Sequence, residues 1–481
     1  MGRVLMIGYG PLPQPGLTQS SRQALRTRQF LKGVLEGGHA VHLFTLPPPT
    51  GPANGNEPPA LVPAEYEGFQ FQSFTKHSGE FSIRALNEQV QFLQPEAIVA
   101  VNTYPSYIAA MLTATLPLWS DLNGFWMAEM QARCWAENDD SRLVGAWAIE
   151  RTILRRTDKF SAVSRPQLYA VLGEMASIGR LNRHTFDYPF GVHIPNAVEP
   201  FPMEQPGPGE FLLRGPIVPE DAFIVLWSGG YNLSSDIQTL VQALDDLMTH
   251  HPEVHFVSTG GKVEGTDTRT YQRFQDLVAA SPHKDRYHLL GWLEAEKLPR
   301  IYREADVGIN VDALNYETLF GGRSRINSMA AEGVVIVTTL GAEISEWLYD
   351  GDAAVTAPMG SPPALAEAIE PFVRDRARLK AIRQRARQIV IADFGISHTT
   401  RGLRSWLASP ALAPDNEAKL KQGGGQLAEF GAISANALES QSVLLDSYDP
   451  RSLMQTKREL EMLRRKPWYR MYQKVRNWLG E

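Results

Sequence analysis

With 481 residues, the chain is too long for one ordinary hydrophobic core, so we expect two large domains with additional segments. Its apolar fraction of 43% argues against a disordered chain, and its net charge of −6 gives no reason to expect a nucleic-acid partner. The single cysteine, Cys134, excludes an intramolecular disulfide and fits a reducing compartment. No signal-peptide pattern and no run of membrane-span length is found, which predicts a cytoplasmic protein.

The first half of the chain alternates short apolar strands with helical patterns. A helix is expected to begin at Ser20 or Ser21 and to stop at Gly37 and Gly38. This order predicts a parallel sheet with right-handed crossovers. Residues 50–63, rich in Pro, Gly and Asn, predict a long exposed loop. The predicted strands are 3–8, 40–45, 69–73, 97–101, 116–120, 159–163 and 192–194.

The loop after the first strand does not carry a dinucleotide-binding fingerprint. Gly8 and Gly10 are followed by Pro-Leu-Pro, and no acidic residue ends the second strand. The pattern therefore excludes NAD as a cofactor. Gly10 belongs either to a tight turn or to a ligand-binding loop, and the sequence leaves both alternatives open.

A polar tract, Ser-Asp-Leu-Asn-Gly, begins at the last residue of the predicted strand 116–120. Open α/β sheets bind ligands at the carboxyl ends of their strands, so Asp121 and Asn123 are candidate cleft residues. The alternative is that Asp121 simply caps the next helix, because Asp is a preferred N-cap residue.

A stretch dense in Pro and Gly, residues 195–221, divides the chain near its middle. We place the first domain at 1–205, a linker at 206–221 and the second domain at 222–395, with helices at 236–250 and 268–280. Two α/β domains joined by a hinge predict a cleft between two rows of strand ends. The second domain's predicted strands are 223–227, 254–258, 287–290, 307–311, 334–337 and 353–356.

The C-terminal part is predicted to contain a closing helix at 396–409, then a linker and helical tail over 410–481. Aromatic and apolar residues recur at helical spacing in 463–479, among six basic residues. Such a helix is suited to lie on the anionic inner face of a membrane. Docking on the protein's own body or on a partner helix is the alternative.

The stretch 315–339 concentrates the chemistry of the second domain. It carries the carboxylate Glu317, a Gly-Gly turn, then Arg323, Ser324 and Arg325 at the start of a short helix. Arginine forks and a helix N-terminus favour a phosphate, while the carboxylate suits sugar hydroxyls. The alternative is a surface loop with a solvated charge pair.

Several motifs together resemble those of retaining, nucleotide-sugar-dependent glycosyltransferases of the GT-B fold, in the broad family-four group. The tract HLLGWLEAEKLPRIYREADVGINV resembles the segment before the family's donor loop, and VVIVTTLGAEISEWL resembles its continuation. VHIPNAVEP is similar to the end of the family's first domain, and LWSGGYNLSSDIQTLVQAL to the start of its donor domain. The resemblance covers residues 1–408 and is strongest from 220 to 350. It implies two Rossmann-like domains facing a cleft.

The resemblance also implies an activity and residues for it. It implies transfer of a sugar from a nucleoside diphosphate sugar with retention, with no metal and no other cofactor at the catalytic centre. The acceptor would be a sugar, a lipid-linked molecule or a small molecule, as in glycan, glycolipid or surface polysaccharide synthesis. Glu317 would bind sugar or ribose hydroxyls, and Asp121 would lie near the developing cationic sugar. The diphosphate would be bound by Gly229, Gly230, Lys262, Arg323, Ser324 and Arg325, and the acceptor side or cleft lined by Gly10, Arg26, Asn123 and Asn196.

The chain also departs from the family pattern. Its common members carry a second glutamate eight positions after the first, where this chain has Arg325, or Ser328 when the count runs back from Gly333. Tyr231 and Asn232 replace a basic pair. These departures leave a second hypothesis open: a catalytically silent binding or scaffold protein with the same fold. No Cys/His cluster has metal-ligand spacing.

Overall fold

The computed structural model describes residues 2–13, 21–47, 58–199, 211–263 and 267–421. Its first sheet has the strand order β3-β4-β2-β1-β5-β6-β7-β8. All neighbours pair in parallel except β3 and β4, which are antiparallel. Its strands are β1 (Arg3–Tyr9), β2 (Ala40–Leu46), β3 (Leu61–Tyr66), β4 (Phe69–Phe74), β5 (Ala97–Val101), β6 (Leu118–Leu122), β7 (Lys159–Ala162) and β8 (Gly191–His193).

Helices cover both faces of this sheet. On one face, α1 buries Phe30 and Leu31 against β1 and β5; on the other, α2 buries Leu86 and α3 buries Ile108. Ser21 caps α1 by accepting the Ala24 N–H at 3.0 Å, which confirms one of the two predicted helix starts. The helices are α1 (Arg22–Glu36), α2 (Gly79–Leu93), α3 (Thr103–Ala110), α4 (Trp126–Glu137), α5 (Leu143–Arg156) and α6 (Arg165–Ser177).

The second sheet is parallel throughout, with the order β11-β10-β9-β12-β13-β14. Its central strand β9 lies between β10 and β12, so the ends of three neighbouring strands meet at one edge. The strands are β9 (Phe223–Ser228), β10 (Val254–Thr259), β11 (Tyr287–Gly291), β12 (Val307–Asn310), β13 (Val335–Thr339) and β14 (Ala354–Ala357). The two α/β domains confirm the predicted fold class.

Helices also sandwich the second sheet. Helices α7, α8 and α13 build one apolar layer with β9, and α9, α11, α12 and α14 build the other. The helices are α7 (Ile237–His250), α8 (Arg269–Ala280), α9 (Leu298–Glu304), α10 (Tyr316–Phe320), α11 (Ser324–Ala331), α12 (Glu343–Asp350), α13 (Pro362–Arg374) and α14 (Leu379–Phe394), with 3-10 turns η1 (Lys284–Arg286) and η2 (Arg376–Arg378).

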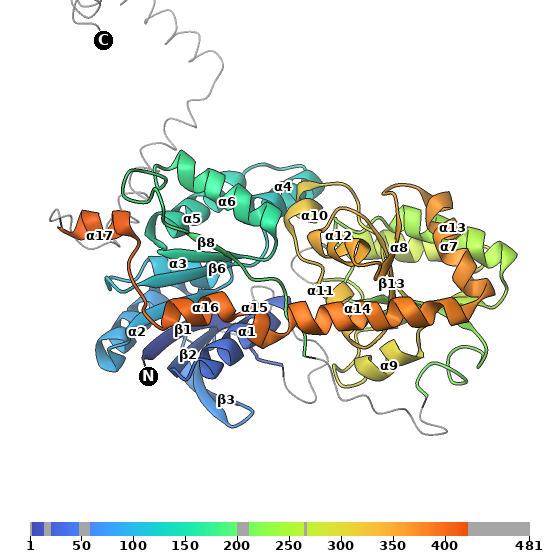
Figure 1. The fold of residues 1–481 in the computed structure, drawn as a ribbon, viewed down its shortest axis with the longest axis horizontal. Coiled ribbons are helices and arrows are strands. Elements are labelled where there is room, and N and C mark those ends of the chain that lie inside the picture. Colours follow the sequence, from blue (N-terminus) through green and yellow to red (C-terminus); the bar gives the residue numbers. More distant parts are fainter. Residues whose placement is uncertain (1, 14–20, 48–57, 200–210, 264–266, 422–481) are drawn as a thin grey trace, which may run out of the picture. The chain divides into compact units, whose positions relative to one another are not determined.

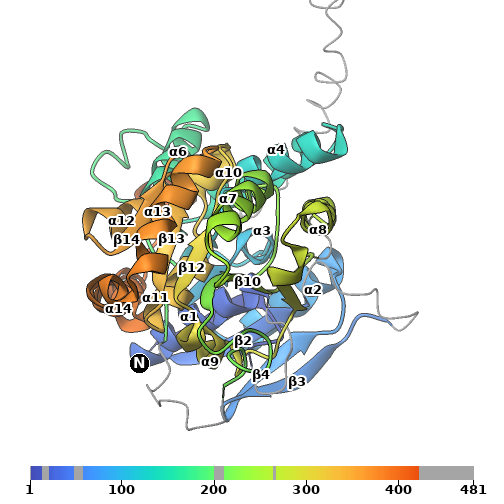
Figure 2. The same ribbon diagram turned by 90° about the vertical axis from the view of Figure 1, so that its right-hand side faces the viewer.

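The hairpin of β3 and β4 differs from the sequence prediction. Residues 61–63 were expected in an exposed loop, yet they begin β3 and pair with β4. The turn uses Glu67 at φ 48° and Gly68 at φ 80°, the left-handed pair that a tight hairpin requires. Figure 2 shows β3 and β4 at the rim of the first domain.

The chain returns to the first domain after α14. The predicted closing helix is two helices, α15 (Ile396–Thr399) and α16 (Arg401–Leu407), which pack against α1 (Figure 1). Leu403 and Leu407 join the core of the first sheet, and Trp406 lies 5.5 Å from Trp119, between ring centroids. Two chain segments therefore connect the domains.

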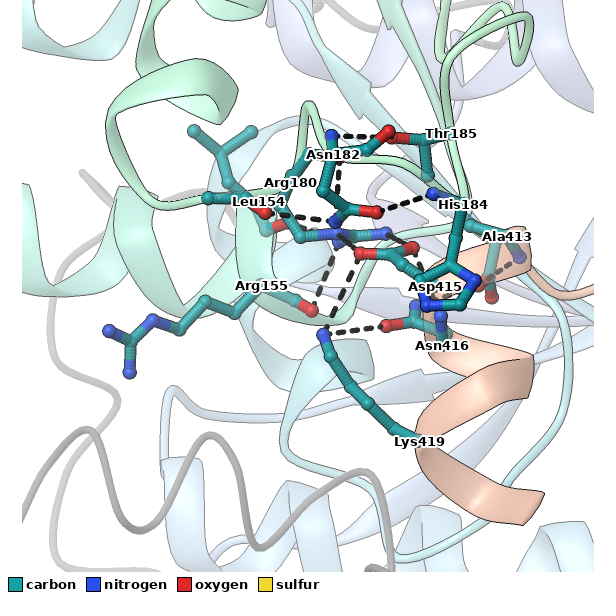
Figure 3. A network of polar contacts seen from close by, with 12 residues as sticks. Leu154, Arg155, Arg180, Asn182, His184, Thr185, Ala413, Asp415, Asn416 and Lys419 are labelled. Atoms are coloured by element: carbon teal, nitrogen blue, oxygen red, sulfur yellow. Dashed lines mark hydrogen bonds and ion pairs between the residues drawn. The ribbon is translucent and has the colours of Figure 1, made fainter. Parts of the chain in front are cut away.

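Helix α17 (Pro414–Lys421) also differs from the prediction, which placed a linker there. Arg180 donates Nε and Nη2 to Asp415 at 2.6 and 3.0 Å, and both side chains are 2% exposed (Figure 3). Asn416 donates to Asp158 at 2.8 Å. Buried polar contacts therefore fix this helix to the first domain.

The predicted tail helix at 463–479 lies outside the described residues, and its membrane contact stays a prediction. Within the described part of the chain, no helix combines the length and apolar character needed to cross a membrane.

Candidate functional site

The end of β9 forms a turn that meets α11. Gly229, at φ 93°, donates its N–H to Thr259 O at 2.6 Å, so this amide is engaged inside the protein. The Gly230 carbonyl accepts a hydrogen bond from Arg325 Nη2 at 2.5 Å. The guanidinium of Arg325 lies over the indole of Trp227, 4.2 Å from the ring centroid. The structure thus joins Gly230 and Arg325, two of the predicted residues, at the strand ends.

Arg325 carries an unused donor. Its Nη1 is buried and has no hydrogen-bond partner among the described residues. The pKa of Arg325 is lowered to about 10, mainly by burial; the charges of Arg22 and Arg323 add to this effect, and Asp312 opposes it. A desolvated cation with a free N–H is a site that an anionic ligand can complete.

Arg323 is held by two carboxylates. It donates to Asp312 at 2.9 Å and to Glu317 at 3.4 Å, and it is 7% exposed. Burial lowers the pKa of Arg323, but Asp312 and Glu317 outweigh this effect and raise it. This buried network excludes the alternative of a solvated surface charge pair.

Glu317 remains an anion in this setting. It lies in the first turn of α10, whose N-cap Asn315 accepts the Thr318 N–H at 2.8 Å. Burial raises the pKa of the Glu317 carboxyl, but Arg323, a Ser234 hydrogen bond and Arg22 outweigh it, so the pKa is lowered. Its charge and position suit the binding of hydroxyl groups.

The two domains meet directly beside this network. Ser164 donates Oγ to Phe320 O at 2.7 Å, and Asn327 donates Nδ2 to Asn196 O at 2.8 Å. A small pocket lies between them and includes the predicted residues Arg323 and Asn196. Its lining is Val163, Ser164, Pro195, Asn196, Gly321, Gly322, Arg323, Asn327, Glu343, Ile344, Trp347 and Phe394.

Asp121 and Arg26 form a closed pair inside the first domain. Arg26 donates Nη2 and Nε to the two carboxylate oxygens at 2.7 and 3.0 Å, and Ser161 donates to Asp121 at 2.7 Å. Asp121 is 0% and Arg26 1% exposed. Asp121 lies in β6 and does not cap α4, whose N-cap is Phe125. Arg26 also binds the Ile194 and Pro195 carbonyls, so the pair anchors the chain where it leaves the first sheet.

The remaining predicted residues lie around the strand ends. Asn123 donates to Asn102 at 3.4 Å, and the Gly10 N–H is donated to Leu46 O at 2.9 Å. A Cβ at Gly10 would press on Thr45, which supports the tight-turn interpretation. Ser324 begins α11. Lys262 is exposed and lines a groove with Thr268, Arg269, Tyr271, Gln272 and Gln275.

Two residues near these strand ends were not predicted from the sequence. Asn102 follows β5 with φ 76° and ψ 162°, a backbone conformation that non-glycine residues rarely adopt and that clusters at functional sites. Glu129, on α4, interacts electrostatically with Glu317 of the other domain. An asparagine after an apolar strand was a usable signal for Asn102, whereas nothing local marks Glu129.

Among the described residues, no group of three or more His, Cys, Asp and Glu side chains could hold a metal ion.

Comparison with known proteins agrees with this architecture. Residues 222–375, which contain the Gly229 turn and both arginines, match the family model described as glycosyl transferases group 1. The second domain is therefore similar to glycosyl transferases group 1 over these residues. "Putative glycosyltransferase YtcC" of Bacillus subtilis (strain 168) is 24% identical over 198 residues, which are 41% of this chain and 48% of that protein. The match thus spans about half the length of this curated relative.

Solved structures share the fold of both domains. A sucrose-phosphate synthase from Thermosynechococcus elongatus aligns with a TM-score of 0.62 at 16% identity, covering 85% of this chain and 98% of that one. The E. coli trehalose-6-phosphate structure bound with UDP-2-fluoro glucose aligns with a TM-score of 0.61 at 12% identity, covering 85% of this chain and 100% of that one. Anabaena Alr3699/HepE in complex with UDP and glucose aligns with a TM-score of 0.58 at 12% identity and the same coverage. These alignments confirm the GT-B fold.

Proposed function

We propose that the chain transfers a sugar from a nucleoside diphosphate sugar to an acceptor, with retention of configuration. The observation that carries this proposal is Arg325, which lies over Trp227 beside the Gly229-Gly230 turn with one buried N–H unused. This arrangement lies at the carboxyl end of a central parallel strand, where open α/β sheets bind ligands.

The chemistry requires donors that are fixed before the reaction begins. Negative charge grows on the departing nucleoside diphosphate, and preorganised N–H donors stabilise it. We assign this task to Arg325 first, then to Gly230 and Ser324. Arg323, held by Asp312 and Glu317, adds positive charge and keeps Glu317 ionised for sugar or ribose hydroxyls.

The donor base is proposed by analogy. Two structures of the same fold are described as bound with UDP-2-fluoro glucose and with UDP and glucose, which makes a uridine diphosphate sugar the first donor to test. We keep a sugar, lipid-linked or small-molecule acceptor and a place in glycan or surface polysaccharide synthesis as part of this proposal. Membrane contact through 463–479 and a cytoplasmic location stay predictions.

Calorimetry on the full chain tests the donor site. The panel is UDP, GDP, ADP, CDP and dTDP, with the corresponding nucleosides as control ligands without phosphate. We expect one diphosphate to bind and its nucleoside to bind at least about tenfold more weakly, because charged hydrogen bonds contribute about 1.5–3 kcal/mol. Absence of binding by every diphosphate would overturn the proposal.

Retention is tested on the product. Incubation with the matching nucleotide sugar and a panel of acceptor sugars should give a glycoside whose anomeric proton coupling matches that of the donor. The opposite coupling would contradict retention while leaving glycosyl transfer intact.

A further inference from the structure

Glu129 lies where the first domain meets the second. It occupies the first turn of α4, which contacts α10, the helix that carries Glu317. The rings of Phe125 and Phe320 meet edge to face at 4.9 Å and fix these two helices against each other. A carboxylate of the first domain therefore lies on a helix that contacts the helix carrying Glu317, and the two carboxyls interact electrostatically.

The Glu129 carboxylate packs against Gly124, where a residue with a Cβ would clash with it. A Cβ at Gly124 would overlap Glu129 Oε1, so the side chain packs on this turn of the Ser-Asp-Leu-Asn-Gly tract. Gly124 has φ 90°, and its carbonyl accepts Gln167 Nε2 at 2.8 Å. The turn that the sequence marked as a cleft candidate thus positions Glu129.

Burial and neighbouring charges shift the pKa values of Glu129 and Glu317 in opposite directions. Burial is the main cause that raises the pKa of Glu129 to about 7, and Glu317 adds to it; Arg22 of α1, Arg133 of α4 and Arg323 oppose it. Glu150 of α5 also interacts with Glu129 and is itself buried. Two carboxyls whose environments push their pKa values apart commonly divide the roles of proton acceptor and fixed charge.

We propose that Glu129 is the acceptor-side proton acceptor of the transfer. This inference rests on the proposed function. In the step, the acceptor oxygen bonds to the anomeric carbon, and the bond from that carbon to the diphosphate oxygen breaks with its electron pair on the diphosphate. The hydroxyl proton passes to a Glu129 carboxylate oxygen. Atoms and charge balance with no further reagent.

Other carboxylates near the site are less suited to this task. Both oxygens of Asp121 are engaged by Arg26 and Ser161 in a site with no exposure. Glu317 is paired with Arg323, which favours its charged form and disfavours its taking a proton. Glu129 combines a place at the domain junction with a carboxyl that can change its protonation state near neutral pH.

The first test measures turnover of UDP-glucose with water as the acceptor, from pH 5 to 9. The wild-type kcat should rise with pH and level off above about 7, because the carboxyl must be ionised to accept a proton. Glu129→Gln should lower kcat about 10²–10⁴-fold, as expected for loss of a general base, remove the rising limb and change KM for UDP-glucose little. Glu137→Gln, the same change at the exposed end of α4, should behave like wild type. A Glu129→Gln profile equal to wild type overturns the proposal.

The second test does not need turnover. Carbon-13 spectra of the full chain with labelled glutamate carboxyls, assigned by loss of a signal in Glu129→Gln, report the titration of Glu129. We expect a midpoint near 7 that moves to lower pH in Glu317→Gln, because a like charge is removed. A midpoint at the ordinary glutamate value overturns the proposal. If wild type binds no nucleoside diphosphate, the proposed function fails instead, whatever Glu129 shows.

Discussion

The guanidinium of Arg325 lies over the indole of Trp227 at 4.2 Å, and its Nη2 is donated to Gly230 O at 2.5 Å. Ring and carbonyl together fix the side chain from two directions while Nη1 stays without a partner in the described part of the chain. Side chains fixed before the ligand arrives lose little entropy on binding, which favours a phosphate site here.

Arg325→Ala should weaken nucleoside diphosphate binding about 10–150-fold, the range that corresponds to 1.5–3 kcal/mol for hydrogen bonds to a charged group. Arg325→Lys should recover only part of the loss, because lysine keeps the charge without the fork. Titration calorimetry measures both. Arg378→Ala removes an exposed arginine that also lies over an aromatic ring, Phe372, and should leave the affinity unchanged. Equal affinities for the Arg325 and Arg378 variants would contradict the assignment.

Glu317→Gln should reduce stability in a pH-dependent way. The pKa of Glu317 is lower in the folded protein than in the unfolded chain. The ionised carboxylate therefore stabilises the fold fully above the unfolded-state pKa of about 4.3, and this stabilisation is lost as pH falls through the folded-state pKa. Its contacts to Arg323 are long, 3.4 Å, so we expect about 1 kcal/mol at pH 7, or about 2–4 °C in melting temperature.

Thermal denaturation at pH 7 and at pH 3.5 checks this expectation. The difference between wild type and Glu317→Gln should shrink at the lower pH, while Glu367→Gln, an exposed glutamate of α13, should show no such difference. A difference that grows on acidification would show that Glu317 is not stabilised as an anion.

The strands of both domains could be predicted because a buried parallel strand is a continuous apolar run. Ala97–Val101 was predicted to the residue, and every residue of it is buried. Strand β3 does not meet this criterion, because its sequence Leu-Val-Pro-Ala-Glu-Tyr contains Pro63 and Glu65 and only Tyr66 is buried. Its place at the edge of the sheet explains that composition, and no local pattern reveals it.

The site was predictable only where its residues are close in sequence. Glu317, Arg323 and Arg325 lie within nine positions, and their residue types alone indicate an anion site. Asp121 was predicted to lie in an open cleft, but it is buried. Its partner, Arg26, lies 95 residues away in the sequence, so no local pattern indicates this pairing. Glu129 was missed because its significance comes from α10 of the other domain.

Asp121→Ala should destabilise the fold by about 3–5 kcal/mol, because it leaves the buried charge of Arg26 unpaired. Urea denaturation followed by tryptophan fluorescence measures the loss. Asp140→Ala removes an exposed carboxylate of the same domain and should have little effect. The double variant Arg26→Ala with Asp121→Ala should lose less stability than the sum of the two single variants. An Asp121 variant of normal stability that fails in turnover would restore the catalytic role predicted from the sequence.

Asp415→Ala should release α17 from the first domain. Among the described residues, Asp415 is the only carboxylate bound to the Arg180 fork. Both groups are buried, so its removal should cost about 3–5 kcal/mol locally. Glu417→Ala, two residues away, removes an exposed carboxylate paired with Lys421 at 2.7 Å and should cost under about 1 kcal/mol. Trypsin should then cut after Lys419 sooner in the Asp415 variant than in wild type or the Glu417 variant, because local unfolding exposes the helix backbone. Equal cleavage rates at Lys419 in all three proteins would mean that the Arg180 pair does not fix this helix.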